Sequence, residues 1–211
     1  MLEHLPGEPD FAPVDQKRMT EQLACALARV HAVPLDDELC RLLEREPDDW
    51  RPEAKEPAQL DESLDEARLR AALSELGAWP RRNAQVLLHG DYWPGNVLWQ
   101  DGQLSAVLDW EESGLGDPLS DIAITRLDVL WAFGDAAMDS FTACYREQTD
   151  IDWQELPRWD LRVALRPMGN LARWAAAYAP PPISRPDIDE HSMQAGHRRF
   201  VARALQSLGK G

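Results

Sequence analysis

Lysine is scarce in this 211-residue chain, and none of its three copies lies in an expected strand. Lys17 falls in a predicted helix, Lys55 in a proline-rich stretch and Lys210 in the tail. The sequence also lacks the patterns GxGxxG and GxxxxGK, whose glycines let a backbone loop cradle phosphate groups. These 211 residues therefore contain neither a strand-borne lysine nor a glycine-rich phosphate loop.

Cysteine and long apolar runs are also in short supply. The three cysteines have no CxxC spacing, which argues against a disulfide framework or a zinc site and favours a reducing, cytoplasmic location. No apolar run reaches the length of a membrane span. The N-terminus lacks the basic and apolar regions of a secretory signal, so we expect no membrane partner.

Positive charge is outweighed by negative charge. The chain has 22 Lys and Arg against 37 Asp and Glu, a net charge of −15. Nucleic-acid binding requires a basic footprint, so no nucleic-acid partner is expected. An acidic balance would attract a cationic small substrate, although solubility is the simpler explanation.

Hydrophobic periodicity predicts a mostly helical chain. Apolar residues three and four apart predict a helix from Asp15 to His31, and Asp117-Pro118 is typical of a helix start. Residues 45–62 are rich in proline and charge and are interpreted as a loop. The remaining predicted helices cover 61–76, 117–134, 135–148, 156–178 and 191–208, and Pro167 is expected to kink or interrupt the 156–178 helix.

Three short apolar runs interrupt this helical pattern. They are AQVLLHG, NVLWQ and LSAVLDW, and Asp101-Gly102 between the last two is a strong hairpin signal. We therefore expect a mainly α fold with a small β-hairpin region that carries the chemistry.

Two segments beside the expected hairpin combine residues suited to phosphoryl transfer. They are HGDYWPGN at 89–96 and LDWEESGLGDPLSD at 108–121. Such a reaction needs a base for the attacking hydroxyl, and oxygen ligands that hold Mg²⁺ against the phosphates. Asp91 fits the base, and Asn96 and Asp109 fit the ligands, because the hairpin would bring Asp109 back beside the loop.

The two segments resemble the HGDxxxxN and (I/L)DWE…GDPxxD motifs of the aminoglycoside phosphotransferase and choline kinase group, which is distantly similar to protein kinases. The resemblance implies the C-terminal lobe of the protein-kinase-like fold. It also implies transfer of the γ-phosphoryl group of ATP to a hydroxyl of a small molecule, with Mg²⁺. Asp91 would be the catalytic base, and Asn96 and Asp109 the metal ligands.

The same resemblance suggests supporting roles for neighbouring residues. His89 would support the loop, Asp117 would cap the following helix, and Asp121 would accept backbone hydrogen bonds from the catalytic loop. Glu111 and Glu112 would contact a cationic substrate, with a solvated acidic face as an equal alternative.

Trp93 departs from the resemblance, because related loops often have His or Lys before the proline. A charged contact to phosphate from position 93 is therefore not expected.

By the same resemblance, residues 1–14 are a hinge-like segment and 15–211 the C-terminal catalytic and substrate lobe. The backbone from Glu3 through His4 to Leu5 would meet adenine. The N-terminal lobe that covers the nucleotide is expected to be absent from these residues. The chain would then be a fragment, a short protein completed by a partner, or a relic used only for binding. The complete set of Asp91, Asn96 and Asp109 argues against a relic.

The identity of the substrate is left open by the sequence. Aminoglycoside-like, choline-like, amino-acid-like and sugar acceptors all remain candidates. The alternative function is a non-catalytic binding module derived from the same lobe.

Overall fold

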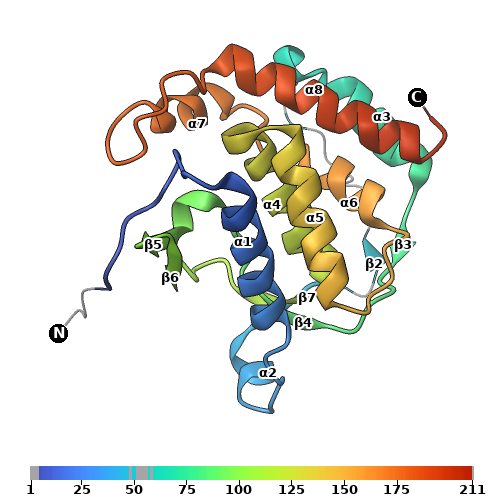
Figure 1. Cartoon of the computed structure of the whole chain (residues 1–211). Coiled ribbons are helices and arrows are strands. Elements are labelled where there is room, and N and C mark those ends of the chain that lie inside the picture. Colours follow the sequence, from blue (N-terminus) through green and yellow to red (C-terminus); the bar gives the residue numbers. More distant parts are fainter. Residues whose placement is uncertain (1–4, 48, 51–56, 58, 211) are drawn as a thin grey trace.

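The computed structural model describes residues 5–47, 49, 50, 57 and 59–210 (Figure 1). Most of these residues are helical. The helices are α1 (Gln16–His31), α2 (Leu39–Leu42), α3 (Glu66–Leu76), α4 (Pro118–Phe133), α5 (Asp135–Gln148), α6 (Leu156–Val163), α7 (Leu171–Tyr178) and α8 (Glu190–Ser207), with 3₁₀ turns η1 (Glu62–Leu64) and η2 (Pro94–Asn96).

Helix α4 is the centre of the fold. It is buried continuously from Pro118 to Ala132, as expected for a helix that is apolar on nearly every side. It begins where the Asp117 carboxylate accepts the backbone N–H of Leu119 at 3.0 Å, and Gly134 ends it. Helices α5 and α6 pack directly on α4, while α1 packs on α5 and α8 on α6. Figure 1 shows α1, α4 and α5 running side by side through the middle of the molecule.

The strands are short and form three small sheets. Strands β5 (Val97–Gln100) and β6 (Gln103–Val107) form an antiparallel hairpin, with positive φ at both turn residues, Asp101 (52°) and Gly102 (71°). That geometry is typical of a tight type I′ turn. The other sheets are β1 (Glu44–Arg45), β7 (Gly114–Gly116) and β4 (Val86–Leu88) in the order β1-β7-β4, and β2 (Asp49–Trp50) with β3 (Trp79–Pro80).

The predicted helices and hairpin are confirmed, with two refinements. Pro167 lies in a run of turns over 164–170 that separates α6 from α7, so the predicted 156–178 helix is interrupted. The predicted 61–76 helix begins as η1 and continues as α3 after Asp65, which has a φ of 55°. That left-handed residue changes the chain direction between the two.

The interpretation of 45–62 as a loop is wrong at two places. Arg45 belongs to β1, which pairs in parallel with β7, and β2 covers Asp49–Trp50. These strands are too short to give a periodic signal, and their partners lie far along the chain. Residues 48, 51–56 and 58 of the same prediction lie outside the described residues.

The predicted hinge-like segment lies against the β5–β6 hairpin where it is described. Glu8 exchanges two backbone hydrogen bonds with Trp99, at 3.1 and 2.9 Å, and the hydroxyl of Ser105 donates to the carbonyl of Pro6. Glu3 and His4 lie outside the described residues, and Leu5 is exposed.

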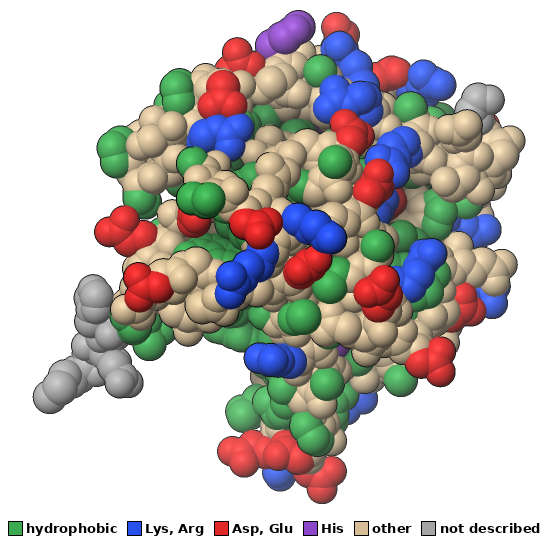
Figure 2. Space-filling model, viewed as in Figure 1, with side chains coloured by type: hydrophobic (Ala, Val, Ile, Leu, Met, Phe, Trp, Pro, Cys, Tyr) green, Lys and Arg blue, Asp and Glu red, His purple; other side chains and the backbone are tan. Residues whose placement is uncertain are grey.

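The face shown in Figure 2 carries acidic and basic side chains interspersed, without one continuous basic area. Among the described helices, none is both long enough and apolar enough to cross a bilayer.

Candidate active site

The loop between β4 and β5 presents Asp91 with both carboxylate oxygens in use. Its Oδ1 accepts a hydrogen bond from Nη2 of Arg166 at 2.7 Å, and its Oδ2 accepts one from Nδ2 of Asn96 at 3.2 Å. The same Asn96 nitrogen donates to the backbone carbonyl of Asp91 at 3.0 Å. The 3₁₀ turn η2 brings Asn96 back toward Asp91, since the backbone N–H of Asn96 donates to the carbonyl of Trp93. Asp91 and Asn96 thus form one compact unit.

Asp121 of α4 holds the start of this loop. Its two carboxylate oxygens accept the backbone N–H groups of His89 at 2.7 Å and Gly90 at 2.8 Å. Its side chain is fully buried, and Oδ2 also contacts Nε2 of His31 at 3.1 Å. A buried carboxylate requires such partners, because leaving it unpaired would cost several kcal/mol of desolvation. The loop backbone is therefore attached to the central helix.

His89 links the loop to the residue that precedes Asp109. Its Nε2 donates to the carbonyl of Leu108 at 2.8 Å, so the proton lies on that nitrogen. Nδ1 is then the acceptor for the backbone N–H of Asp91 at 3.3 Å. The ring is fully buried and lies 4.6 Å, centroid to centroid, from the ring of Trp110. One neutral imidazole therefore connects the two sequence motifs.

The hairpin register brings Asp109 toward Asn96. Val97 pairs with Val107, and the N–H of Leu108 donates to the carbonyl of Asn96 at 2.8 Å. Asp109 follows directly, with a φ of 61°. A left-handed aspartate is tolerated but uncommon, and such residues concentrate at functional sites. The backbone turns at this point, and the Asp109 side chain is exposed.

The oxygen atoms of these two residues suit a hard divalent cation. Nδ2 of Asn96 faces Asp91, and among the described residues no donor bonds to its Oδ1. The exposed Asp109 carboxylate likewise makes no bond to another described residue. Amide and carboxylate oxygens are the ligands that Mg²⁺ prefers. Among the described residues, no group of three His, Cys, Asp or Glu could hold a metal ion, so an asparagine oxygen would be needed.

Asp117 is buried away from this pair. Besides capping α4, its Oδ1 accepts from Asn83 at 3.0 Å, and its N–H donates to the Glu46 carboxylate at 3.2 Å. Glu46 also accepts from the Ser120 hydroxyl and pairs with Arg162 at 3.3 Å. Burial raises the pKa of Glu46 above its usual value, and Arg162 opposes that change.

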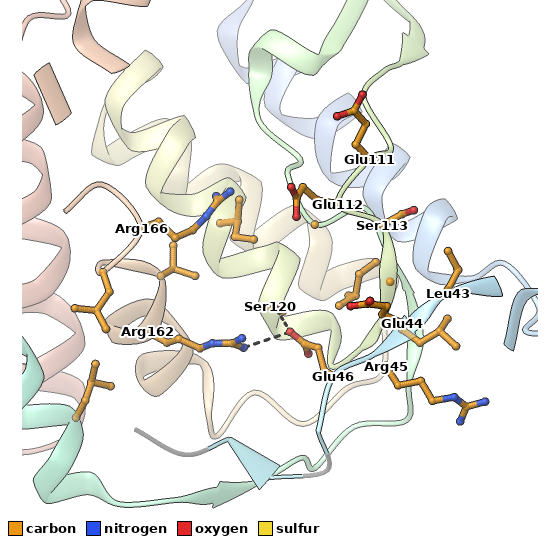
Figure 3. Close-up of a pocket in the computed structure, with 18 of the residues that line it drawn as sticks. Leu43, Glu44, Arg45, Glu46, Glu111, Glu112, Ser113, Ser120, Arg162 and Arg166 are labelled. Carbon is orange, nitrogen blue, oxygen red and sulfur yellow. Dashed lines mark hydrogen bonds and ion pairs between the residues drawn. The ribbon is translucent and has the colours of Figure 1, made fainter. Parts of the chain in front are cut away.

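A cavity of about 1770 Å³ opens beside the loop between β4 and β5 (Figure 3). Its lining includes Gly90, Ser120 and Ile124, the β1 segment and the turn after β6. Figure 3 shows Arg162 and Arg166 on one wall, with the turn that carries Glu111, Glu112 and Ser113 across from them. Its charged lining residues are the glutamates Glu44, Glu46, Glu111 and Glu112 and the arginines Arg45, Arg70, Arg162 and Arg166.

Some of the charged side chains around the cavity have ion-pair partners and others do not. Arg162 pairs with Glu46, Arg70 with Glu66, and Arg166 with Asp91. The carboxylates of Glu44, Glu111 and Glu112 form no hydrogen bond or ion pair within the described part of the chain, and all three are exposed. Arg45 bonds only to the neutral Gln85 among the described residues, so three unpaired carboxylates face one unpaired guanidinium and the unpaired charge on the cavity wall is mainly negative. The prediction that Glu111 and Glu112 meet a substrate is untested by these contacts, although both residues line the cavity.

Sequence reasoning did not identify Arg166 or Asp128. Asp128 lies on α4 one turn beyond Ile124 and is 8% exposed, and it forms no hydrogen bond to another described residue. Burial raises the pKa of Asp128 to about 7; the Arg166 guanidinium opposes this rise and the Asp91 carboxylate adds to it. The sequence did carry a signal for Asp128, because it is a charged residue in an otherwise apolar helix and lies seven residues after Asp121, on the same helix face. No sequence signal placed Arg166 beside Asp91.

Comparisons with known proteins identify the family and the fold of this chain. Residues 1–161 match the phosphotransferase enzyme family (APH). Viomycin phosphotransferase of Streptomyces vinaceus is 33% identical over 141 residues, 58% of this chain and 47% of that protein. Acyl-CoA dehydrogenase family member 11 of Rattus norvegicus is 30% identical over 117 residues, 44% of this chain and 15% of that protein. The chain thus spans less than half the length of either relative.

A solved structure extends the likeness over nearly the whole chain. The macrolide 2'-phosphotransferase MphH of Brachybacterium faecium, an apoenzyme, has a TM-score of 0.55 and 24% identity, covering 96% of this chain and 68% of that chain. At this identity the likeness shows the fold, and it confirms the prediction of a mainly α chain with the fold of these phosphotransferases. The family match confirms the resemblance drawn from the two motifs: this chain belongs to the phosphotransferase enzyme family.

Proposed function

We propose that this chain carries the catalytic and metal-binding part of an ATP-dependent phosphotransferase that acts on a hydroxyl group of a small molecule. The observation that carries the proposal is the assembly of Asp91, Asn96 and Asp109. Asn96 bonds directly to Asp91, while His89 and the backbone of Asn96 each bond to Leu108, the residue before Asp109. Gly90, which precedes Asp91, and Arg166, which bonds to Asp91, line a cavity large enough for a small molecule.

Each residue has a defined task in this proposal. Asp91 orients the substrate hydroxyl and receives its proton, while Asn96 fixes the carboxylate through its amide nitrogen. Asn96 Oδ1 and the Asp109 carboxylate would hold Mg²⁺, which when bound neutralises charge on the phosphates. His89 and Asp121 keep the loop in position, because their side chains accept hydrogen bonds from its backbone N–H groups.

The substrate is proposed to be cationic. Glu44, Glu111 and Glu112 leave unbalanced negative charge on the cavity wall, which attracts amines. Hygromycin-B 4-O-kinase of Escherichia coli is 37% identical over 59 residues, 27% of this chain and 17% of that protein. Its name and that of viomycin phosphotransferase make antibiotics the first substrates to test.

The adenine contact proposed for Glu3, His4 and Leu5, and the division into a 1–14 hinge and a 15–211 lobe, remain proposals. The nucleotide would be covered by a further lobe, from the same polypeptide or from a partner, because neither lysine in the described part of the chain, Lys17 or Lys210, lies in a strand. The intact mass of the protein from its own cells, compared with 23.9 kDa, distinguishes these two sources. We also retain the proposal of a cytoplasmic location.

The test is turnover by the protein as its own cells make it. Viomycin and hygromycin B are incubated with MgATP, and phosphorylated product is detected by mass spectrometry. Asp91→Asn should lower kcat by about 10²–10⁴-fold with nucleotide affinity retained, because general-base catalysis contributes that much. Asp101→Asn, in the exposed hairpin turn, is the matched control.

Two results would contradict the assignments. Full turnover by Asp91→Asn would refute the assignment of Asp91 as the general base. An unchanged affinity for the Mg-nucleotide in Asp109→Ala would refute the assignment of Asp109 as a metal ligand. Binding of an antibiotic by the wild-type protein without any consumption of ATP would support the alternative, a non-catalytic binding module.

A further inference from the structure

The catalytic loop has no positive charge of its own. Its residues 91–96 are Asp, Tyr, Trp, Pro, Gly and Asn. Trp93 is directed into an aromatic cluster, with ring centroids 6.0 Å from both Phe11 and Tyr178. Its ring also fills the space where a side chain at Gly95 would begin. Position 93 therefore serves packing, and the loop cannot itself neutralise charge on a phosphoryl group.

A cation reaches Asp91 from a different part of the chain. Nη2 of Arg166 lies 2.7 Å from Oδ1 of Asp91, although the two residues are 75 positions apart. The Arg166 backbone is held in the turns after α6, where its N–H donates to the carbonyl of Val163 at 2.9 Å. The carbonyl of Ala164 in turn accepts a buried hydrogen bond from His197 at 2.8 Å. The guanidinium is thus delivered to Asp91 by an anchored backbone.

Stability is a poor explanation for this ion pair. Both side chains are 32% exposed, and ion pairs that water reaches to this extent contribute about 0–1 kcal/mol. Arg166 also lines the cavity where the substrate is proposed to lie. A guanidinium carries five N–H donors in a planar fork, so one bond to Asp91 leaves others for a second anion. The Asp128 carboxyl, on the α4 side, attracts this guanidinium when it is ionised.

We propose that Arg166 is a catalytic residue that bridges Asp91 and the transferring phosphoryl group, an inference that rests on the proposed function. It supplies, from the end of α6, the cation that the loop lacks. In this step the substrate hydroxyl oxygen forms a bond to the γ-phosphorus, and the bond to the β,γ-bridging oxygen breaks. ADP leaves with that electron pair, and the hydroxyl proton passes to Asp91. Arg166 stabilises the equatorial oxygens as their charge shifts.

The test compares the transition-state analogue with the ground state. Binding of ADP, and of ADP with aluminium fluoride as a mimic of the transferring group, is measured in the presence of Mg²⁺ for the complete native protein. Arg166→Gln should leave the affinity for ADP within about twofold and weaken the fluoride complex by about 10²-fold, the effect of losing one such donor. Arg166→Lys should keep part of the affinity, because it keeps the charge and loses the fork.

A control and a second readout make the result specific. Arg158→Gln removes an arginine of α6 that pairs with Glu155 at 3.2 Å outside the cavity lining, and it should behave as the wild type. The kcat for viomycin in Arg166→Gln should fall in parallel with the analogue affinity, with an unchanged melting temperature. Wild-type affinity for the fluoride complex in Arg166→Gln, or a rise in kcat, would overturn the proposal. A wild-type protein that neither traps the analogue nor turns over would overturn the proposed function and this inference together.

Discussion

Asp128 gives the most quantitative prediction of the structure. Among the buried polar side chains of α4 in the described part of the chain, its carboxyl is the one without a hydrogen bond to another described residue. Burial raises its pKa from 3.8 to about 7. Each unit corresponds to about 1.4 kcal/mol, so the ionised form costs the folded state up to about 4 kcal/mol.

The sign follows from proton binding. Because the folded pKa lies above the unfolded one, the folded state binds more protons between pH 4 and pH 7. Asp128 therefore does not lower the free energy of unfolding below about pH 4. It lowers it increasingly as the pH rises, and by a constant amount above about pH 7. By the same relation, the cost is about 2 kcal/mol at pH 5 and about 4 kcal/mol at pH 8.

The perturbation is Asp128→Asn, which keeps the shape and removes the charge. Its free energy of unfolding, relative to the wild type, should rise by about 2–3 kcal/mol between pH 5 and pH 8. Urea unfolding at the two pH values measures this, and any packing cost of the amide cancels in the difference. Asp101→Asn, in the exposed hairpin turn, should show the same small effect at both. A pH-independent difference for Asp128→Asn would refute the reasoning.

Two further predictions concern the backbone of the site. Gly90→Ala should destabilise the fold by at least about 2 kcal/mol and lower turnover, because φ is +83° and the new Cβ would meet the carbonyl oxygen of Glu112. Gly102→Ala is the control: its φ is +71° but nothing lies within 4 Å of the new Cβ, so it should lower the free energy of unfolding by only about 1 kcal/mol. Asp121→Asn should cost about 3 kcal/mol in urea unfolding, since an amide N–H₂ would face backbone N–H donors that now meet a carboxylate. Equal costs at both glycines, or a neutral Asp121→Asn, would contradict these assignments.

The long-range contacts of the site explain why one part of it was predictable and another was not. Asp91, Asn96 and Asp109 lie within one loop and the next hairpin, so their identities and spacing are visible in the sequence. Arg166 reaches Asp91 because the turns after α6 are held against the rest of the molecule, which no local pattern encodes. Glu46 was hidden in a predicted loop for the same reason, since its contacts with Ser120 and Arg162 span more than 70 residues.

The sequence by itself determined where the principal helices and the hairpin begin and end. Capping at Asp15 and Asp117, the break at Pro167 and the turn at Asp101-Gly102 depend on each residue's own backbone preferences, which act over a few positions. Only the tertiary structure decided which charges meet around the cavity and which buried carboxyl has no hydrogen bond to another described residue. Those outcomes depend on how α6 and the 42–46 segment pack around α4, and packing depends on the whole chain at once.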